Sequence, residues 1–319
     1  MGFIKRTVCP CCKSKEDQKV LLEEYFNSNY FKHWIDHIAS KPAGGYRPEV
    51  EEILDEKYEI TKCGNCGLIY QSIIPDSELL HKAYESWYDQ DENLRFNLSL
   101  DNRRVKIQRF LTEVYSFIQF YNQPVNRIKV MDFGMGWSEW SIAARSLGLE
   151  PIGLEISPSK VKYASSLGFE AQTLEQQEES SVDFINTEQV FEHLDEPFEY
   201  LQNLVRLLKP GGVVKLSVPN GSKIEENLKK YDFNSEEGFR KLNPVNPIEH
   251  LNCYNTESLV SLGKSCGLRP VELIKYDFQK SRKVFRPLNA LKELARSIKH
   301  YNIDQFNKLN GPTLIFFQK

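Results

Sequence analysis

The sequence has no long hydrophobic run. None approaches the roughly 18 consecutive apolar residues that a membrane-spanning helix requires. The first residues lead directly to paired cysteines, without the apolar core of a secretory signal. Internal repeats and low-complexity tracts are absent as well. We therefore expect a cytoplasmic globular protein with no membrane span.

The chain also lacks a strong excess of charge of either sign. Its formal net charge is -3 over 319 residues, with 41 Lys and Arg against 44 Asp and Glu. This balance gives no overall field that attracts nucleic acid, so a nucleic-acid partner is not expected. Hydrophobic residues make up 40%, which is enough for a full core. The length suits two modest domains, or one α/β domain with a large appendage.

Two Cys-x-x-Cys pairs near the N-terminus predict a zinc site. Cys9 and Cys12 form the first pair, Cys63 and Cys66 form the second, and Cys11 is left over. Four thiolates complete a tetrahedral shell around zinc, so the site is expected to be structural and not catalytic. The pairs are about 50 residues apart, which is long for a zinc finger. Buried thiols without metal remain the alternative.

The segment around the cysteines is expected to form a module of its own. We predict a zinc-ribbon-like module over residues 1–75 with a helical insert at 21–38, followed by a helical linker or lid over 76–125. The aromatic residues of the insert indicate packing in a core, with one wall of a substrate pocket as the alternative. They are Tyr25, Phe26, Tyr30, Phe31 and Trp34.

A strand, a glycine turn and a helix follow one another from residue 128. The apolar strand ends at Asp132, and Gly134 and Gly136 form a turn before the helix predicted over 140–147. Glycines let the backbone fold sharply beneath a ligand, and the helix N-terminus then presents its amides. Glu155 ends the next strand, 19 positions after Gly136, where Rossmann-type folds bind ribose hydroxyls.

Strands and helices continue to alternate to the end of the chain. We therefore predict an α/β fold over 126–319, a Rossmann-like seven-stranded mostly parallel sheet with helices on both faces. A basic helical insertion is predicted at 279–310. It would form a solvated surface, a lid, a dimer contact or a binding site for an anionic substrate. The other predicted strands lie at 151–156, 169–173, 182–187, 213–218, 268–278 and 313–317, and the helices at 159–167 and 198–208.

Four ordered segments give the chain a family resemblance. Residues 132–136, 153–157, 190–194 and 208–212 have the order and spacing of class I S-adenosylmethionine-dependent methyltransferases, which the chain resembles over 128–278. The cysteine module resembles the zinc-binding segment of a subset of these enzymes, including some that modify sugars. The resemblance implies methyl transfer to a small molecule, most simply O-, N- or C-methylation of a sugar or nucleotide-sugar.

The resemblance also implies which residues bind S-adenosylmethionine. The glycines would approach its methionine part, and Glu155 would hold the ribose. Ser138 stands where the family often has a third glycine, beside Trp137, and we expect it to cap the following helix. The full set of expected cofactor-binding residues is Asp132, Gly134, Met135, Gly136, Glu155, Ile156, Leu174, Glu188, Gln189 and Tyr88.

Two histidines are predicted to be catalytic. His193 follows the fourth strand of the sheet, and His250 lies beyond a loop rich in Asn and Pro. Either could remove a proton from the acceptor. Either could equally brace its loop by hydrogen bonds, and Glu188 and Glu249 are alternative bases.

Three other functions remain open at this stage. An RNA or protein methyltransferase could use the zinc ribbon for docking, and a non-catalytic protein could keep a relic cofactor pocket. A nicotinamide-dependent dehydrogenase is disfavoured because residues 192–194 and 209–212 follow the methyltransferase pattern. A homodimer is compatible with the sequence.

Overall fold

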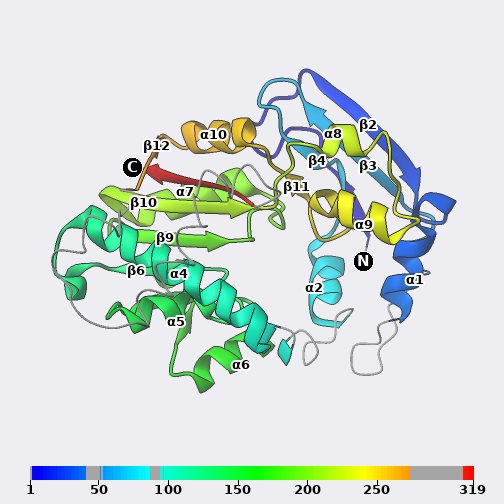
Figure 1. The fold of residues 1–319 in the computed structure, drawn as a ribbon. Coiled ribbons are helices and arrows are strands. Elements are labelled where there is room, and N and C mark those ends of the chain that lie inside the picture. The colour runs from blue at the N-terminus through cyan, green and yellow to red at the C-terminus, as the bar shows by residue number, and fades with distance from the viewer. Residues whose placement is uncertain (1, 41–50, 52, 87–93, 96, 274–311) are drawn as a thin grey trace.

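A seven-stranded sheet forms the centre of the chain (Figure 1). The computed structural model describes residues 2–40, 51, 53–86, 94–95, 97–273 and 312–319. The strand order is β12-β13-β10-β9-β6-β7-β8, with β13 antiparallel to both of its neighbours and the other pairings parallel. This arrangement confirms the predicted fold class. The strands are β6 (Val130–Phe133), β7 (Pro151–Leu154), β8 (Ala171–Gln172), β9 (Val182–Glu188), β10 (Leu208–Val218), β12 (Arg269–Val271) and β13 (Thr313–Gln318).

Helices cover both faces of this sheet, because successive side chains of a strand point to opposite sides. On β9, Phe184 packs in one core cluster with α4 and α5, and Ile185 packs in another with α7 and α10. The rings of Phe117 and Phe184 stack with their centroids 4.1 Å apart. The helices are α4 (Leu100–Tyr121), α5 (Glu139–Ser146), α6 (Pro158–Ser166), α7 (Pro197–Leu207) and α10 (Thr256–Ser265).

A second, four-stranded sheet lies on the N-terminal side, in the order β11-β4-β3-β2 (Figure 1). The strand β11 (Asn252–Cys253) comes from the part of the chain that carries the seven-stranded sheet, and it pairs with β4. The N-terminal segment is therefore joined to the rest by backbone hydrogen bonds. The remaining strands of this part are β1 (Phe3–Lys5), β2 (Gln18–Tyr25), β3 (Lys57–Cys63), β4 (Ile69–Gln71) and β5 (Ile73–Pro75), with β1 paired to β5.

The helix predicted over 21–38 was wrong in its first part. Residues 21–25 belong to β2, which pairs along its length with β3, and the helix α1 covers only Lys32–Ser40. Pairing with β3 overrides the local helical pattern. The expectation of core packing is met for Phe26, Phe31 and Trp34, which are buried together.

The buried aromatics also contact the chain after β10. Phe31 stacks on Phe233 with centroids 5.7 Å apart, and the indole of Trp34 donates to Asn246 Oδ1 at 3.1 Å. The short helices α8 (Ile224–Asn227) and α9 (Glu236–Leu242) belong to this region. The helix α2 (Ser77–Ser86) lies beside β5. The 3-10 turns of the described chain are Asn29–Phe31, Val125–Arg127, Leu174–Gln176 and Asn243–Val245.

Two predictions cannot be placed in this fold. Tyr88 and the basic insertion at 279–310 lie outside the described residues. Within the described part of the chain, no helix combines the length and the apolar character needed to span a membrane.

Candidate active site

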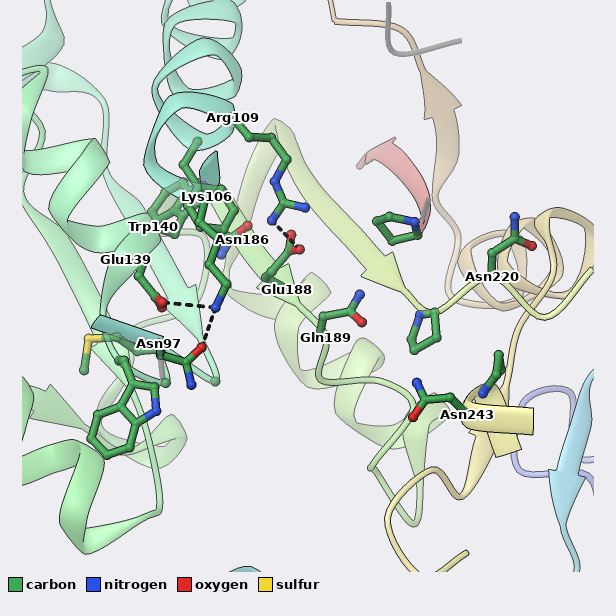
Figure 2. A pocket seen from close by; sticks show the side chains of 18 of the residues that line it. Asn97, Lys106, Arg109, Glu139, Trp140, Asn186, Glu188, Gln189, Asn220 and Asn243 are labelled. Carbon is green, nitrogen blue, oxygen red and sulfur yellow. Dashed lines mark hydrogen bonds and ion pairs between the residues drawn. The ribbon is translucent and has the colours of Figure 1, made fainter. Parts of the chain in front are cut away.

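A cavity of about 970 Å³ opens at the edge of the sheet where the parallel strands end. Figure 2 shows Lys106 and Arg109 reaching from α4 toward Glu139 and Glu188, with Asn243 across the cavity. Six of the expected cofactor-binding residues line this cavity. They are Asp132, Gly134, Met135, Gly136, Glu188 and Gln189.

The glycine turn has the backbone that a close approach requires. Gly134 has a φ of 70°, and a Cβ built on it would lie 2.5 Å from Val190 Cγ2. Any larger residue here would collide with the segment that follows β9. Gly136 also has a positive φ of 55°. The turn is therefore packed against residues 188–190, so that two predicted cofactor segments lie side by side.

Glu155 is anchored at the same turn. Its Oε2 accepts a hydrogen bond from the Gly136 amide at 2.8 Å, and its Oε1 accepts from the amides of Ile156 and Ser157, each at 2.9 Å. Ile156 is 95% exposed beside this carboxylate, whereas Leu174 is half-buried against the core. Neither these two residues nor Glu155 is among the residues that line the cavity.

Ser138 does not cap α5, contrary to the sequence-based expectation. It adopts a left-handed conformation with a φ of 63°, and its buried hydroxyl has no hydrogen-bond partner among the described residues. A cap requires an extended backbone that turns the side chain toward the first helical amides. The tight turn after Gly136 imposes a different geometry, so Ser138 occupies a position that glycine normally takes.

Asp132 is held in a buried hydrogen-bond network. Its Oδ2 accepts from Ser141 Oγ at 2.6 Å, and its Oδ1 accepts from Asn186 Nδ2 at 2.7 Å. Burial raises the pKa of Asp132 to about 6, against the opposing effect of these hydrogen bonds and of Lys215. Asp132 therefore supports the floor of the cavity from within the sheet.

A buried lysine connects the sheet to α4. Lys215 Nζ lies 2.7 Å from Glu188 Oε2, 2.9 Å from Glu113 Oε1 and 2.9 Å from Asn186 Oδ1. Arg109 Nη2 reaches the other oxygen of Glu188 at 2.6 Å. Although burial alone would raise it, the pKa of Glu188 is lowered by the charges of Lys215 and Arg109. Glu188 is thus an ionised carboxylate paired with two cations.

Sequence reasoning missed this network and the contacts around it. The one available signal was Lys215 itself, a lone charge inside an otherwise apolar strand. The spacing of residues in α4 did not indicate that Arg109 would pair with Glu188. It also did not indicate the contacts of Lys106, whose Nζ lies 3.1 Å from Glu139 Oε1 and 2.7 Å from Asn97 Oδ1 (Figure 2). These contacts join residues far apart in sequence, which no local pattern reveals.

The two predicted catalytic histidines lie against each other. Their rings are edge to face, with centroids 4.9 Å apart. His193 Nδ1 is 2.8 Å from the Glu249 carbonyl, and His250 Nδ1 is 2.6 Å from the carbonyl of Asn243, which lines the cavity. The lining residues include neither imidazole, so the pair stands behind the cavity wall at Asn243.

Both imidazoles are neutral at ordinary pH. Burial, reinforced by the neighbouring His250, lowers the pKa of His193 to about 3, and burial lowers the pKa of His250 to about 4. The alternative base Glu249 accepts a hydrogen bond from the side chain of Asn246. Burial raises the pKa of Glu192, beside His193, well above its usual range.

The four predicted zinc ligands form one cluster. The Sγ atoms of Cys9, Cys12, Cys63 and Cys66 all lie within 4.8 Å of one another. Two of these separations are 3.6 Å, close to the roughly 3.8 Å edge of a tetrahedron with Zn–S bonds near 2.3 Å. Cys11 is not part of this group of four, and its Sγ lies 3.7 Å from the Ser258 carbonyl. The donor set therefore fits zinc.

Comparison with known families decides the enzyme class. A family described as a methyltransferase domain matches residues 102–273, more than half of the chain. The chain belongs to this methyltransferase family. The predicted class, a methyltransferase that uses S-adenosylmethionine, is confirmed at this level. No curated protein matches the chain.

Several solved structures are similar to this chain. A SAM-dependent methyltransferase from Archaeoglobus fulgidus is 18% identical with a TM-score of 0.42, covering 76% of this chain and 100% of that one. The plantazolicin methyltransferase BamL, solved with a triazolic desmethylPZN analog and SAH, is 16% identical with a TM-score of 0.49, covering 72% and 90%. The methyl acceptor of this protein is therefore inferred from its own residues.

Proposed function

We propose that this methyltransferase acts on a small-molecule acceptor, namely a sugar or nucleotide-sugar. The observation that carries the proposal is the cavity itself, which joins the glycine turn to a polar region formed after β10. Its lining between residues 219 and 244 contains three basic side chains and no acidic one. A phosphate-bearing acceptor suits that charge. The basic residues are Lys223, Arg240 and Lys241.

The residues at the turn fit S-adenosylmethionine. We assign the methionine part of the cofactor to Gly134 and Gly136, which both line the cavity and adopt the positive φ that the tight turn requires. We assign the ribose hydroxyls to Glu155, fixed beside Gly136 by its hydrogen bonds. Ile156 offers an exposed apolar surface for the adenine. The remaining assignments are Asp132, Met135, Glu188 and Gln189 at the cavity, with Leu174 and Tyr88 retained from the sequence.

The chemistry requires an aligned and deprotonated nucleophile. When bound, S-adenosylmethionine supplies an electrophilic methyl group on its sulfonium. The protein must hold the acceptor in line with that group and accept or release its proton. We assign activation of the acceptor to His193 and His250, because their rings are in contact and His250 Nδ1 donates to the carbonyl of Asn243 in the cavity wall.

The cysteine cluster has a separate role in this proposal. We infer that Cys9, Cys12, Cys63 and Cys66 bind a structural zinc ion, because four thiolates leave no position open for a substrate. Cys9, Cys63 and Cys66 lie in the same core cluster as Leu259 of α10. Zinc would therefore stabilise the attachment of the N-terminal segment to the methyltransferase domain.

Two experiments test the proposed function. The first is calorimetry with S-adenosylmethionine and S-adenosylhomocysteine, using Glu155→Gln and the exposed neighbour Glu150→Gln as matched variants. We expect Glu155→Gln to weaken binding about tenfold or more, since hydrogen bonds to a charged group contribute about 1.5–3 kcal/mol. Glu150→Gln should bind as the wild type does. Equal affinities in the two variants would contradict the ribose assignment.

The second experiment identifies the acceptor class. The enzyme is incubated with methyl-labelled S-adenosylmethionine and, separately, with pools of nucleotide-sugars, free glycans, RNA and protein. We expect label in the nucleotide-sugar pool, and a higher KM for that pool in Arg240→Gln. Label only in RNA or protein would favour docking through the zinc module and would overturn the substrate class.

A further inference from the structure

Glu192 is a buried carboxylate, one oxygen of which has no hydrogen-bond partner in the described part of the chain. It follows β9 and is 1% exposed, and that oxygen is Oε2. Burying a carboxylate oxygen without a hydrogen-bond partner costs folding free energy, and a bound ligand would account for such an atom. One oxygen of Glu192 and one ring nitrogen each of His193 and His250 lie within 4.8 Å of one another.

The two imidazoles are oriented as metal ligands are. A carbonyl oxygen can only accept a hydrogen bond, so His193 donates from Nδ1 to Glu249 O and His250 donates from Nδ1 to Asn243 O. In a neutral ring the proton on Nδ1 leaves a lone pair on Nε2. His193 Nε2 lies 3.8 Å from Glu192 Oε1. Backbone carbonyls that fix the tautomer in this way are the usual outer partners of metal-binding histidines.

Hydrogen bonds from Asn252 connect the segment that carries Glu192 and His193 to the segment that carries His250. Asn252 Nδ2 donates to the carbonyls of Phe191 at 3.0 Å and Leu194 at 2.6 Å, and the Asn252 amide donates to Glu192 O at 3.0 Å. The Arg6 guanidinium donates to Asn252 Oδ1 at 3.0 Å. The segments that carry the three side chains are thus cross-linked, which preserves their spacing without a bound ion.

We propose that Glu192, His193 and His250 bind one divalent transition-metal ion, at a site distinct from the four-cysteine cluster. Two imidazole nitrogens and one carboxylate oxygen suit first-row divalent ions, and three protein ligands leave coordination positions open. An acceptor hydroxyl on such an ion would lose its proton to solvent more readily. Its oxygen would then bond to the methyl carbon as the bond from that carbon to the sulfonium breaks, and S-adenosylhomocysteine would leave. This role rests on the proposed function, whereas the binding of the ion does not.

Cobalt is the probe that separates this site from the cysteine cluster. The full chain is first loaded with one equivalent of zinc, and Co²⁺ is then titrated while its absorption spectrum is recorded. We expect one further equivalent to bind with visible d–d bands and without the near-ultraviolet charge-transfer bands of cobalt–thiolate bonds. Binding of no further equivalent, or bands from thiolate ligation alone, would overturn the proposal.

Three variants assign the ligands. Glu192→Gln and His250→Gln keep the approximate shape of each side chain, and His81→Gln removes an exposed histidine of α2 as the matched control. We expect Co²⁺ affinity to fall about 10–100-fold or more in the first two variants, as losses around metal sites do, and to be unchanged in the control. Equal affinity in all three would locate the ion elsewhere and refute the site. Circular dichroism checks that each variant is folded.

Activity then distinguishes the role of the ion from the proposed function. If S-adenosylmethionine binds and turnover rises when Co²⁺ is added to the zinc-loaded enzyme, both proposals are supported. If turnover is independent of Co²⁺ although the ion binds, the catalytic role of the ion is refuted and the metal site remains. If S-adenosylmethionine fails to bind while Co²⁺ binds, the proposed function fails and the metal site remains.

Discussion

Arg109 of α4 forms an ion pair with Glu188 at the end of β9, with Nη2 and Oε1 2.6 Å apart. The other carboxylate oxygen of Glu188 is held by Lys215 at 2.7 Å. Both partners of the first pair are largely buried, with 20% and 16% of their side chains exposed. The pair therefore fixes α4 to the sheet edge along one side of the cavity.

We expect Glu188→Gln to destabilise the protein strongly. It leaves the charges of Lys215 and Arg109 without one of their counter-charges, and breaking a buried ion pair costs about 3–5 kcal/mol. The matched control is Glu179→Gln, which breaks an ion pair with Arg206 in which both side chains are more than 60% exposed. Urea unfolding should show a large loss in the first variant and little change in the second. Similar losses would contradict a structural role for the buried pair.

Arg6 is predicted to position both histidine segments. Its guanidinium donates to the carbonyls of Asp195 at 2.6 Å, Leu194 at 3.4 Å and Leu251 at 3.4 Å, next to His193 and His250. Arg6→Ala should lower kcat about tenfold or more, because small displacements of reacting groups are costly. The affinity for S-adenosylmethionine should be unchanged, since within the described part of the chain no hydrogen bond joins Arg6 to a residue assigned to the cofactor.

The control for this prediction is the neighbouring residue. Lys5 is 64% exposed and lies 3.5 Å from Glu59, so Lys5→Ala should leave kcat near its wild-type value. Stopped-flow or steady-state methyl transfer and calorimetry together separate the two effects. A parallel loss of cofactor affinity in Arg6→Ala would indicate general unfolding and not misplaced histidines.

The sequence predicted the sheet and the glycine turn because both are local patterns. The apolar strand, Gly134, Gly136 and Glu155 lie within about 30 residues, and a parallel strand order follows from the alternation of strands and helices. Long-range pairings were not predictable in this way. The local pattern of residues 21–25 predicts a helix, but pairing with β3 makes this segment a strand. The pairing of β11 with β4 joins segments about 180 residues apart.

The polar network around Asp132 gives a prediction for pH. Its folded pKa, raised to about 6 by burial, lies above the value near 3.9 of an unfolded Asp. The folded state therefore binds more protons between these values, and stability falls as the pH rises from about 4 to about 6. Asp132→Asn should remove this part of the slope while keeping partners for Ser141 and Asn186.

Thermal or urea unfolding at several pH values checks this sign. The exposed Asp36, paired with Lys32 on α1, provides Asp36→Asn as a control that should keep the wild-type slope. Asp132→Asn should gain stability relative to the wild type as the pH rises through this window, and the difference should level off above about pH 6. A constant difference at all pH values would mean that Asp132 does not titrate there.

Loss of zinc is predicted to weaken the whole chain and not only its N-terminal segment. Cys63 lies in the core cluster that also contains Leu259 and Leu262 of α10. The side-chain Nδ2 of Asn65 donates to Cys12 Sγ at 3.3 Å. Cys63→Ser should bind less than one zinc per chain by elemental analysis and unfold at a lower Tm, because metal binding contributes directly to folding. Cys11→Ser is the matched control, since Cys11 is buried nearby but lies outside the four-sulfur group, and it should retain one zinc. Full zinc occupancy in Cys63→Ser, or an equal loss in Cys11→Ser, would contradict the assigned ligand set.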